Sequence, residues 1–166
     1  ALGRKKALMI AAMCYALSAV GTSWAGTLVS FVIWRWLGGV AVGLSSGISP
    51  MYIAEIAPAH LRGRLVTVNQ LVNVIGINLA VVVAYFLSFG DHWRLMFASM
   101  LVPTLIFMLG LCFVPDSPRW LAARGRKEEA FSILAKINGR KQAEAEIEEI
   151  NSQLNQETGN FRELFR

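Results

Sequence analysis

Charged residues are scarce in the first 115 of the 166 residues, and acidic residues are the scarcest. Only Glu55 and Asp91 of the eleven acidic residues, and seven of the sixteen basic ones, precede Asp116. With 55% hydrophobic and 16% charged residues, the chain is too apolar for an ordinary soluble domain and is typical of a membrane protein. The net charge of +5 does not indicate nucleic-acid binding, because the basic residues lie at the ends of apolar runs and form no stripe with interleaved aromatics.

Signals of an enzyme or a metal protein are also missing. The two cysteines, Cys14 and Cys112, lie inside apolar runs, where a thiol is ordinarily a small buried hydrophobic group, and they lack metal-ligand spacing. His60 and His92 are isolated at loop positions, with no nucleophile or phosphate-binding motif beside them. We therefore expect no enzymatic activity, no cofactor and no metal.

Four apolar runs are long enough to cross the hydrocarbon core of a bilayer, which takes about 20 helical residues. They cover residues 7–25, 29–53, 65–89 and 95–114. The sequence thus predicts an all-α membrane protein, with a membrane domain at 1–115 and a cytoplasmic, amphipathic helical segment at 116–166.

Orientation follows from the basic residues, because short loops rich in Lys and Arg stay on the cytoplasmic side. The turn before the first run and the link between the second and third hold five basic residues, whereas the loops on the opposite side hold one. We therefore expect a multi-pass protein of the plasma membrane, the bacterial inner membrane, surrounded by the lipid bilayer. The predicted cytoplasmic parts are residues 1–6, 56–64 and 115–166.

The tail carries helix start and stop signals. Ser117 and Pro118 suit the N-cap and first position of a short helix that ends before Gly125. Apolar residues then recur at helical spacing over 127–137, and Asn138-Gly139 predicts a stop. A further acidic helix with a thin apolar stripe is predicted over 142–154.

Arg35 is the conspicuous polar residue of the apolar runs. A cation at the bilayer centre costs roughly 3 kcal/mol on insertion scales, so such a residue normally faces a protein interior or a wet path. Arg35 shares a helix face with Gly39, four residues on, and is expected to point into the helix bundle. It could form a static internal ion pair, or it could be the partner of a titrating carboxylate, and no carboxylate lies within the four runs except Glu55 at an end.

Small and amide residues mark two further helix faces. Gly39, Gly43 and Gly47 recur every four residues, a spacing that lets two membrane helices pack closely. The third run carries polar side chains that need hydrogen-bond partners inside a membrane. These are Thr67, Asn69, Gln70, Asn73 and Asn78. They could bond between helices or bind a hydroxyl-rich ligand, since amides both donate and accept; composition leaves both open.

Charged residues also gather where the runs meet the predicted cytoplasmic side. Together they could form a network that latches helix ends across a bundle, although each alone could be a solvated or orienting charge. The set is Arg4, Glu55, Arg62, Asp116 and Arg119.

At these residues the chain resembles the sugar porter family of the major facilitator superfamily, over its whole length, as spans three to six with the intracellular helices. The signature elements are Leu37-x-Gly39-Val40-Ala41-x-Gly43 with Tyr52, Glu55 and Arg62; Pro-Asp-Ser-Pro-Arg-Trp at 115–120; Gly-Arg-Lys-Lys at 3–6; and Asn69-Gln70 with Gly76. The stretch 49–63 is most similar to bacterial xylose–proton symporters.

The resemblance implies part of the N-terminal six-helix bundle of a major facilitator fold, followed by short cytoplasmic helices. It also implies roles: Gln70 contacts sugar, with Asn73 as a further candidate from the amide cluster, and Arg35 pairs with a first-span aspartate in proton-coupled members. The charged set named above corresponds to the cytoplasmic salt bridges that stabilise the outward-facing state. Asp116 departs from the usual Glu, and Ile77 stands where the xylose symporter has a second glutamine, which argues against xylose itself.

The expected function is therefore part of a secondary active sugar transporter, working by monosaccharide–proton symport and alternating access. The expected partners are a monosaccharide and a proton. We expect the sequence to be an excerpt of a longer protein, because it lacks the first two spans and the second half of that fold. The alternatives are a truncated, inactive remnant and a transporter-like sugar receptor.

Overall fold

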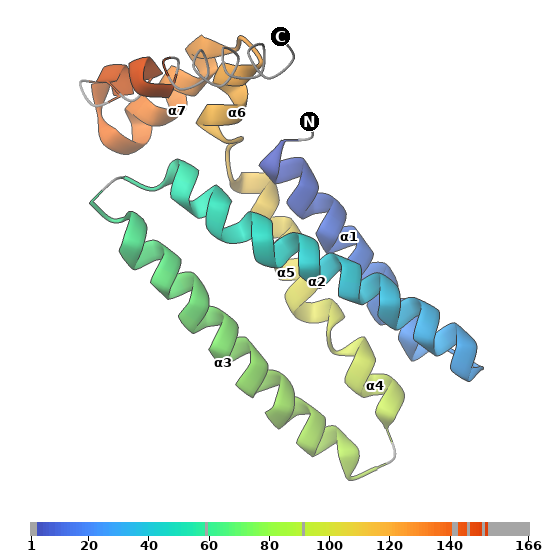
Figure 1. The fold of residues 1–166 in the computed structure, drawn as a ribbon. Helices are drawn as coiled ribbons and strands as arrows, with labels where there is room; N and C mark the ends of the chain where they lie inside the picture. The colour runs from blue at the N-terminus through green and yellow to red at the C-terminus, as the bar shows by residue number, and fades with distance from the viewer. Residues whose placement is uncertain are drawn as a thin grey trace, which may run out of the picture.

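The computed structural model describes residues 3–58, 60–90, 92–140, 143–145, 147–150 and 152. The elements identified there are all α-helices. They are α1 Arg4–Ser23, α2 Leu28–Ile56, α3 Arg62–Ser88, α4 Trp93–Ala98, α5 Leu101–Phe113, α6 Pro118–Ala123 and α7 Lys127–Asn138. Figure 1 shows the long helices side by side and α6 and α7 gathered beyond one end of them, near the start of α1.

Four segments of the described chain are long and apolar enough to cross a membrane: α1, α2, α3 and the stretch Trp93–Phe113. Their mean hydropathy runs from 1.3 to 2.2. The last stretch, which the sequence predicted as one helix over 95–114, consists of α4 and α5 with a turn at Ser99 and Met100. Pro103 explains this break, because it has no N–H to donate to the carbonyl of Ser99, which accepts a 3.2 Å bond from the Val102 N–H.

The closest helix packing is between α1 and α2, and two glycines allow it. A Cβ at Gly38 would lie 2.5 Å from Ser18 Oγ, and one at Gly21 would overlap the Trp34 ring. Ser18 Oγ donates a 2.7 Å hydrogen bond to the Trp34 carbonyl across the same contact. This tight crossing is the small-residue packing of membrane helices, formed by glycines other than the predicted ones.

The predicted glycine stripe lies elsewhere on α2. A Cβ at Gly39, Gly43 or Gly47 would meet no described atom within 4 Å. Close packing of this face against another helix therefore stays a prediction.

A small apolar cluster joins α1, α2 and α5 at the end that carries the tail. Its buried members are Leu8, Tyr52 and Leu111, with Met9, Ile48, Ile56 and Val114 around them. The Tyr52 hydroxyl donates to the carbonyl of Pro115, just after α5. This fixes the point at which the chain leaves the membrane helices for α6.

The tail has its own core, formed by Leu121, Ala122 and Ala130. The predicted start of α6 is confirmed, since Ser117 is its N-cap and Ser117 Oγ accepts from the Trp120 N–H at 3.4 Å. The predicted stops are confirmed as well: α6 ends before Gly125 and α7 ends before Gly139, and both glycines have φ near +80°. The predicted helix over 142–154 falls partly outside the described residues.

Helix α3 stands apart from the other spans over much of its length in Figure 1. None of its residues is buried, although it is one of the most apolar elements. Its side chains are therefore open to contact by lipid or by other helices.

Candidate functional site

A pocket of about 470 Å³ opens between α1, α2, α3 and α5. This volume lies within the range of about 300–1,000 Å³ that small-molecule sites occupy. Its wall is formed by Tyr15, Val42, Ser45, Ser46, Ser49, Asn69, Gln70, Val72, Asn73, Pro103, Thr104 and Phe107. Hydroxyl and carboxamide groups thus converge in the middle of helices that are otherwise almost wholly apolar.

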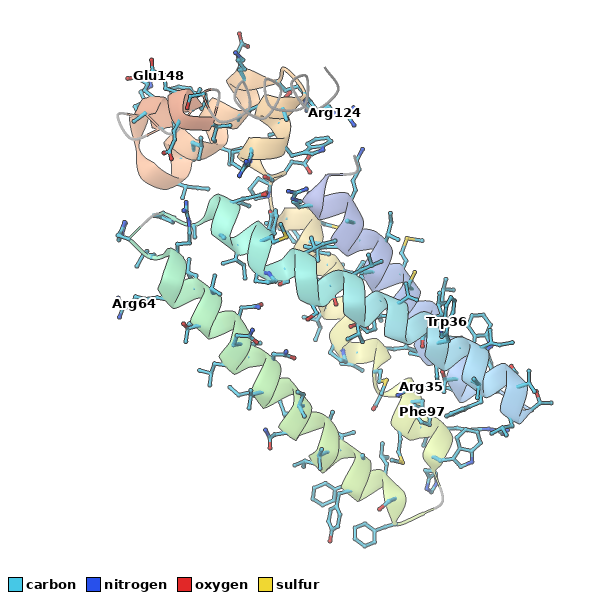
Figure 2. All side chains as sticks on the ribbon, in the orientation of Figure 1. Arg35, Trp36, Arg64, Phe97, Arg124 and Glu148 are labelled. Carbon is cyan, nitrogen blue, oxygen red and sulfur yellow. The ribbon has the colours of Figure 1, made fainter. Side chains whose placement is uncertain are left out.

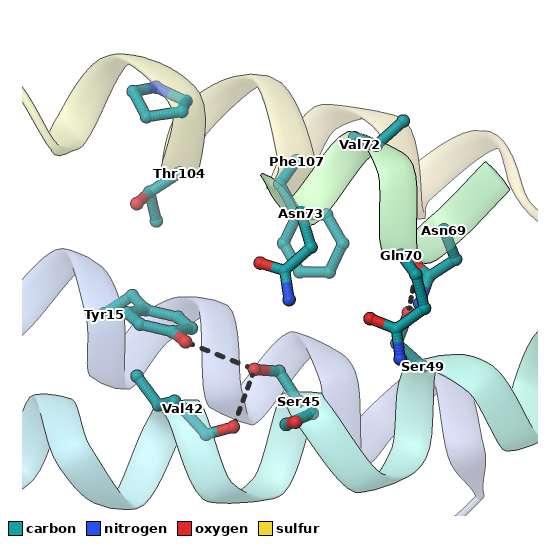
Figure 3. Close-up of a pocket in the computed structure, with 12 residues that line it drawn as sticks. Tyr15, Val42, Ser45, Ser49, Asn69, Gln70, Val72, Asn73, Thr104 and Phe107 are labelled. Atoms are coloured by element: carbon teal, nitrogen blue, oxygen red, sulfur yellow. Dashed lines mark hydrogen bonds between the residues drawn. The ribbon is translucent and has the colours of Figure 1, made fainter. Parts of the chain in front are cut away.

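Three hydroxyl groups of the pocket, those of Tyr15, Ser45 and Ser49, are held by hydrogen bonds, drawn as dashed lines in Figure 3. Ser45 Oγ donates to the Val42 carbonyl at 3.2 Å and lies 3.2 Å from the Tyr15 hydroxyl. Ser49 Oγ donates to Asn69 Oδ1, also at 3.2 Å. These bonds join α1 to α2 and α2 to α3, so they set the shape of the pocket between the helices.

Gln70 and Asn73 project from α3 toward the space in front of α2 in Figure 3. Both side chains are exposed, and the described hydrogen bonds do not include their amide groups. Phe107 supplies an aromatic surface in the same pocket. Free donors and acceptors beside an aromatic face suit a ring that carries several hydroxyl groups.

Asn78, the last member of the predicted amide cluster, lies outside this pocket. Its side chain donates to the Val74 carbonyl of its own helix at 2.8 Å. Thr67 likewise donates to the Gly63 carbonyl at 3.0 Å. Of the amide cluster, the structure therefore brings Asn69, Gln70 and Asn73 to one site.

Arg35 lies on a different part of α2 from the pocket-lining residues. Its guanidinium carbon is 5.3 Å from the centre of the Phe97 ring on α4, and Figure 2 shows the two side chains together. Glu55, the acidic residue of the described spans, is 20 residues further along α2, roughly 30 Å at the helical rise. In the described chain the cation thus meets an aromatic face.

The charged set at the other end of α2 is only partly assembled. Arg4 forms an ion pair with Glu55 at 3.2 Å, and Ser117 Oγ donates to the second carboxylate oxygen at 2.5 Å. Arg62 begins α3, and neither it nor Asp116 forms an ion pair within the described residues. Arg119 has an interaction partner of its own. The structure therefore brings Arg4 and Glu55 together and adds a hydroxyl.

Several contributors to these contacts were not predicted. Ser117 was identified as a helix cap, yet it is also a buried donor to Glu55. Tyr15, Ser45 and Thr104 in the pocket lie on three helices, and no local motif connects them. The centre of the Trp120 ring lies 5.9 Å from Lys6 Nζ and 5.5 Å from the guanidinium carbon of Arg124. The contact with Lys6 joins the start of α1 to the tail.

One further charge pair lies on the surface of the tail. Arg126 donates to both carboxylate oxygens of Glu129, at 2.7 and 2.6 Å. The hydrogen bonds from this guanidinium lower the pKa of Glu129 below its ordinary value. The pair is exposed and lies far from the pocket, so it bears on the start of α7 and not on a ligand.

Comparison with known proteins places these features in context. Residues 1–166 match the family described as "Sugar (and other) transporter". The chain is 42% identical to the D-xylose-proton symporter of Escherichia coli (strain K12) and 39% identical to the arabinose-proton symporter of Bacillus subtilis (strain 168). These alignments cover 92% and 99% of the chain but only 36% and 37% of those proteins, so the chain spans about a third of their length.

This chain is also similar to a solved structure of a transporter. The proton:xylose symporter XylE, of the major facilitator superfamily and bound to 6-bromo-6-deoxy-D-glucose, superimposes with a TM-score of 0.90 at 40% identity. The match covers 98% of this chain and 40% of that one. The expected fold is thereby confirmed: the helices are part of the N-terminal bundle of a major facilitator fold, in a multi-pass inner-membrane protein.

Proposed function

Because the chain belongs to the Sugar (and other) transporter family, we propose that it is part of a secondary active transporter that carries a monosaccharide together with a proton. The chain would supply one wall of the transport path, with the remainder of the fold supplying the other. In such folds the substrate lies near the midplane between two helical halves, which rock to expose it to each side in turn.

The pocket between α1, α2, α3 and α5 carries this proposal. Placing several hydroxyl and amide groups inside apolar spans is costly unless something bonds to them. Gln70 and Asn73 reach into the pocket without a described partner, whereas Asn78 bonds back to its own helix. A sugar would complete the bonding of the two pocket amides, and Phe107 would lie against its apolar face.

Arg35 is the proposed proton-coupling residue. A cation within a membrane span can change the balance between two states if it has a titrating partner, and the resemblance to proton symporters points to a carboxylate on a span that precedes this segment. Protonation of that carboxylate would weaken its ion pair with Arg35. The proton would thus favour one state by binding the two states with different affinity.

The contact of Arg4, Glu55 and Ser117 is the proposed cytoplasmic latch, with Arg62, Asp116 and Arg119 as further members when the complete helix bundle is closed. It ties the start of α1 to the end of α2 and to α6. A coupling energy of about 1–3 kcal/mol would suffice to bias the outward-facing state. In this proposal residues 1–6, 56–64 and 115–166 face the cytoplasm, the lipid bilayer surrounds the four spans, and nucleic acid has no part.

The role is one of carrying rather than chemical conversion. The polar groups of the pocket are neutral amides and hydroxyls, which bind a sugar without activating a nucleophile. Binding and release across a membrane are what such a site supports.

The test is uptake of radiolabelled monosaccharides by the full-length transporter in proteoliposomes, with and without an inward proton gradient. We expect gradient-driven accumulation of at least one sugar. Gln70→Ala and Asn73→Ala should each raise the KM about two- to tenfold, the value of one neutral hydrogen bond, with Asn78→Ala as the matched control. Sugar binding without uptake would identify a receptor, and neither binding nor uptake would identify an inactive remnant; both results contradict the proposal.

A further inference from the structure

The aromatic ring over Arg35 lies in a built cluster. Phe97 makes edge-to-face contacts with Phe31 at 5.4 Å and with Trp93 at 6.4 Å between ring centres. Phe31 and Trp93 also meet edge-to-face, at 6.4 Å. Two of these contacts hold the Phe97 ring in a defined orientation, and the third holds its two partners against each other.

Two residues of α2 contact the Phe97 ring. Phe31 and Arg35 are four residues apart and lie on the same face of that helix, so one contacts the ring of Phe97 and the other places its guanidinium over it. Phe97 sits on the short helix α4, which the turn at Ser99 and Met100 separates from α5. The cation on α2 therefore contacts α4, the part of the fourth span that precedes the turn.

An aromatic face suits this position because it attracts a cation without adding a charge to the membrane. A carboxylate partner alone would leave the guanidinium unpaired each time a proton neutralised that partner. The distance of 5.3 Å from the Phe97 ring is within the range of about 6 Å over which a ring attracts a guanidinium.

We propose that Phe97 is a positioning residue for proton coupling: its ring receives the Arg35 guanidinium whenever the coupling carboxylate is protonated. This rests on the proposed function, since it assumes a titrating partner. Phe97 acts through Arg35, and it contacts neither the sugar pocket nor the proton. The contact between α2 and α4 is then formed in one protonation state and weakened in the other.

A double-mutant cycle tests the contact without any transport. The full-length protein is purified in detergent, and the apparent Tm is measured, at a pH low enough to protonate the coupling carboxylate, for wild type, Phe97→Leu, Arg35→Met and the pair. We expect Phe97→Leu to lower the Tm in both backgrounds, because its ring contacts with Phe31 and Trp93 are lost in both. The loss should be larger in the wild-type background, where the contact with Arg35 is lost as well. Phe97→Trp should keep the wild-type Tm, because it keeps an aromatic face. The matched control is Phe113→Leu, since Phe113 lies at the end of α5 and is 88% exposed. Additive effects of Phe97→Leu and Arg35→Met would overturn the proposal.

Transport assays then distinguish a positioning role of Phe97 from a general loss of folded protein. Phe97→Leu should lower proton-driven accumulation about two- to fivefold, the equilibrium value of an exposed cation–π contact, and leave sugar exchange at equal pH unchanged. Stepwise fluorination of the Phe97 ring should lower accumulation step by step, because each fluorine weakens the negative face of the ring. Equal loss of accumulation and exchange, or no response to fluorination, would refute the role of the ring. If the wild type moves no sugar at all, the proposed function fails, while the cycle still reports on the Arg35 contact.

Discussion

Gly38→Ala tests the account of how α1 and α2 pack. The added Cβ would lie 2.5 Å from Ser18 Oγ, about 1 Å closer than an ordinary contact, so the Ser18 side chain must move. Its 2.7 Å bond to the Trp34 carbonyl is then lost, at about 0.5–1.5 kcal/mol, and the overpacking adds about 1–3 kcal/mol. Replacing a helical glycine with alanine returns at most about 1 kcal/mol, so a net loss of about 0.5–3.5 kcal/mol remains even after that full return.

The assay is the apparent Tm of the purified full-length protein, in which 1 kcal/mol corresponds to a shift of roughly 2–4 °C or less. Gly110→Ala on α5, where an added Cβ meets no described atom within 4 Å, is the matched control and should not lower the Tm. Ser18→Ala combined with Gly38→Ala should cost less than the sum of the two, because the first change removes the clashing oxygen. Strict additivity, or a stable Gly38→Ala variant, would show that the α1–α2 crossing is not as close as described.

The remaining predictions concern the latch and the tail. Glu55→Gln should lower the apparent Tm by the equivalent of about 1 kcal/mol, because it removes the ion pair with Arg4. The glutamine keeps an oxygen that accepts the hydrogen bond from Ser117. An equal effect of Glu55→Gln in an Arg4→Gln background would contradict the pairing. Because the Arg126 guanidinium lowers the pKa of Glu129, this pair stabilises the start of α7 above the ordinary glutamate pKa, and the contribution disappears as pH falls through the lowered value. Carboxyl NMR titration should show the pKa of Glu129 rising in Arg126→Gln, and an unchanged value would refute the pairing.

The features that depend on local sequence were predictable. Apolar runs of membrane length identify helices because the bilayer forces the backbone to bond within each segment. The cap at Ser117 and the stop at Gly139 follow from backbone chemistry within a few residues. The break within the fourth span was missed, although Pro103 marks it, because the run of apolar side chains continues through the turn.

The features that depend on contacts between helices were not predictable from the sequence. Sequence spacing selected Gly39, Gly43 and Gly47, whereas the close approach uses Gly21 and Gly38, which belong to different helices and share no motif. Arg35 could be identified as unusual from its position alone, but its contact with Phe97 requires knowing which face of α4 meets α2. The amides of α3 were predicted to bond between helices or to a ligand, and their role in binding stays a prediction. Only the structure separates Gln70 and Asn73, which line the pocket, from Asn78, which bonds within its own helix.

The central claim, that this chain belongs to a carrier moving a sugar and a proton together, is tested most directly with a pH electrode. Cells that express the full-length transporter are de-energised in weakly buffered medium, and the monosaccharide that they accumulate is added. The account predicts an immediate alkalinisation of the medium, absent in Arg35→Leu, because each sugar molecule carries a proton inward. Sugar entry with no change in external pH would contradict it.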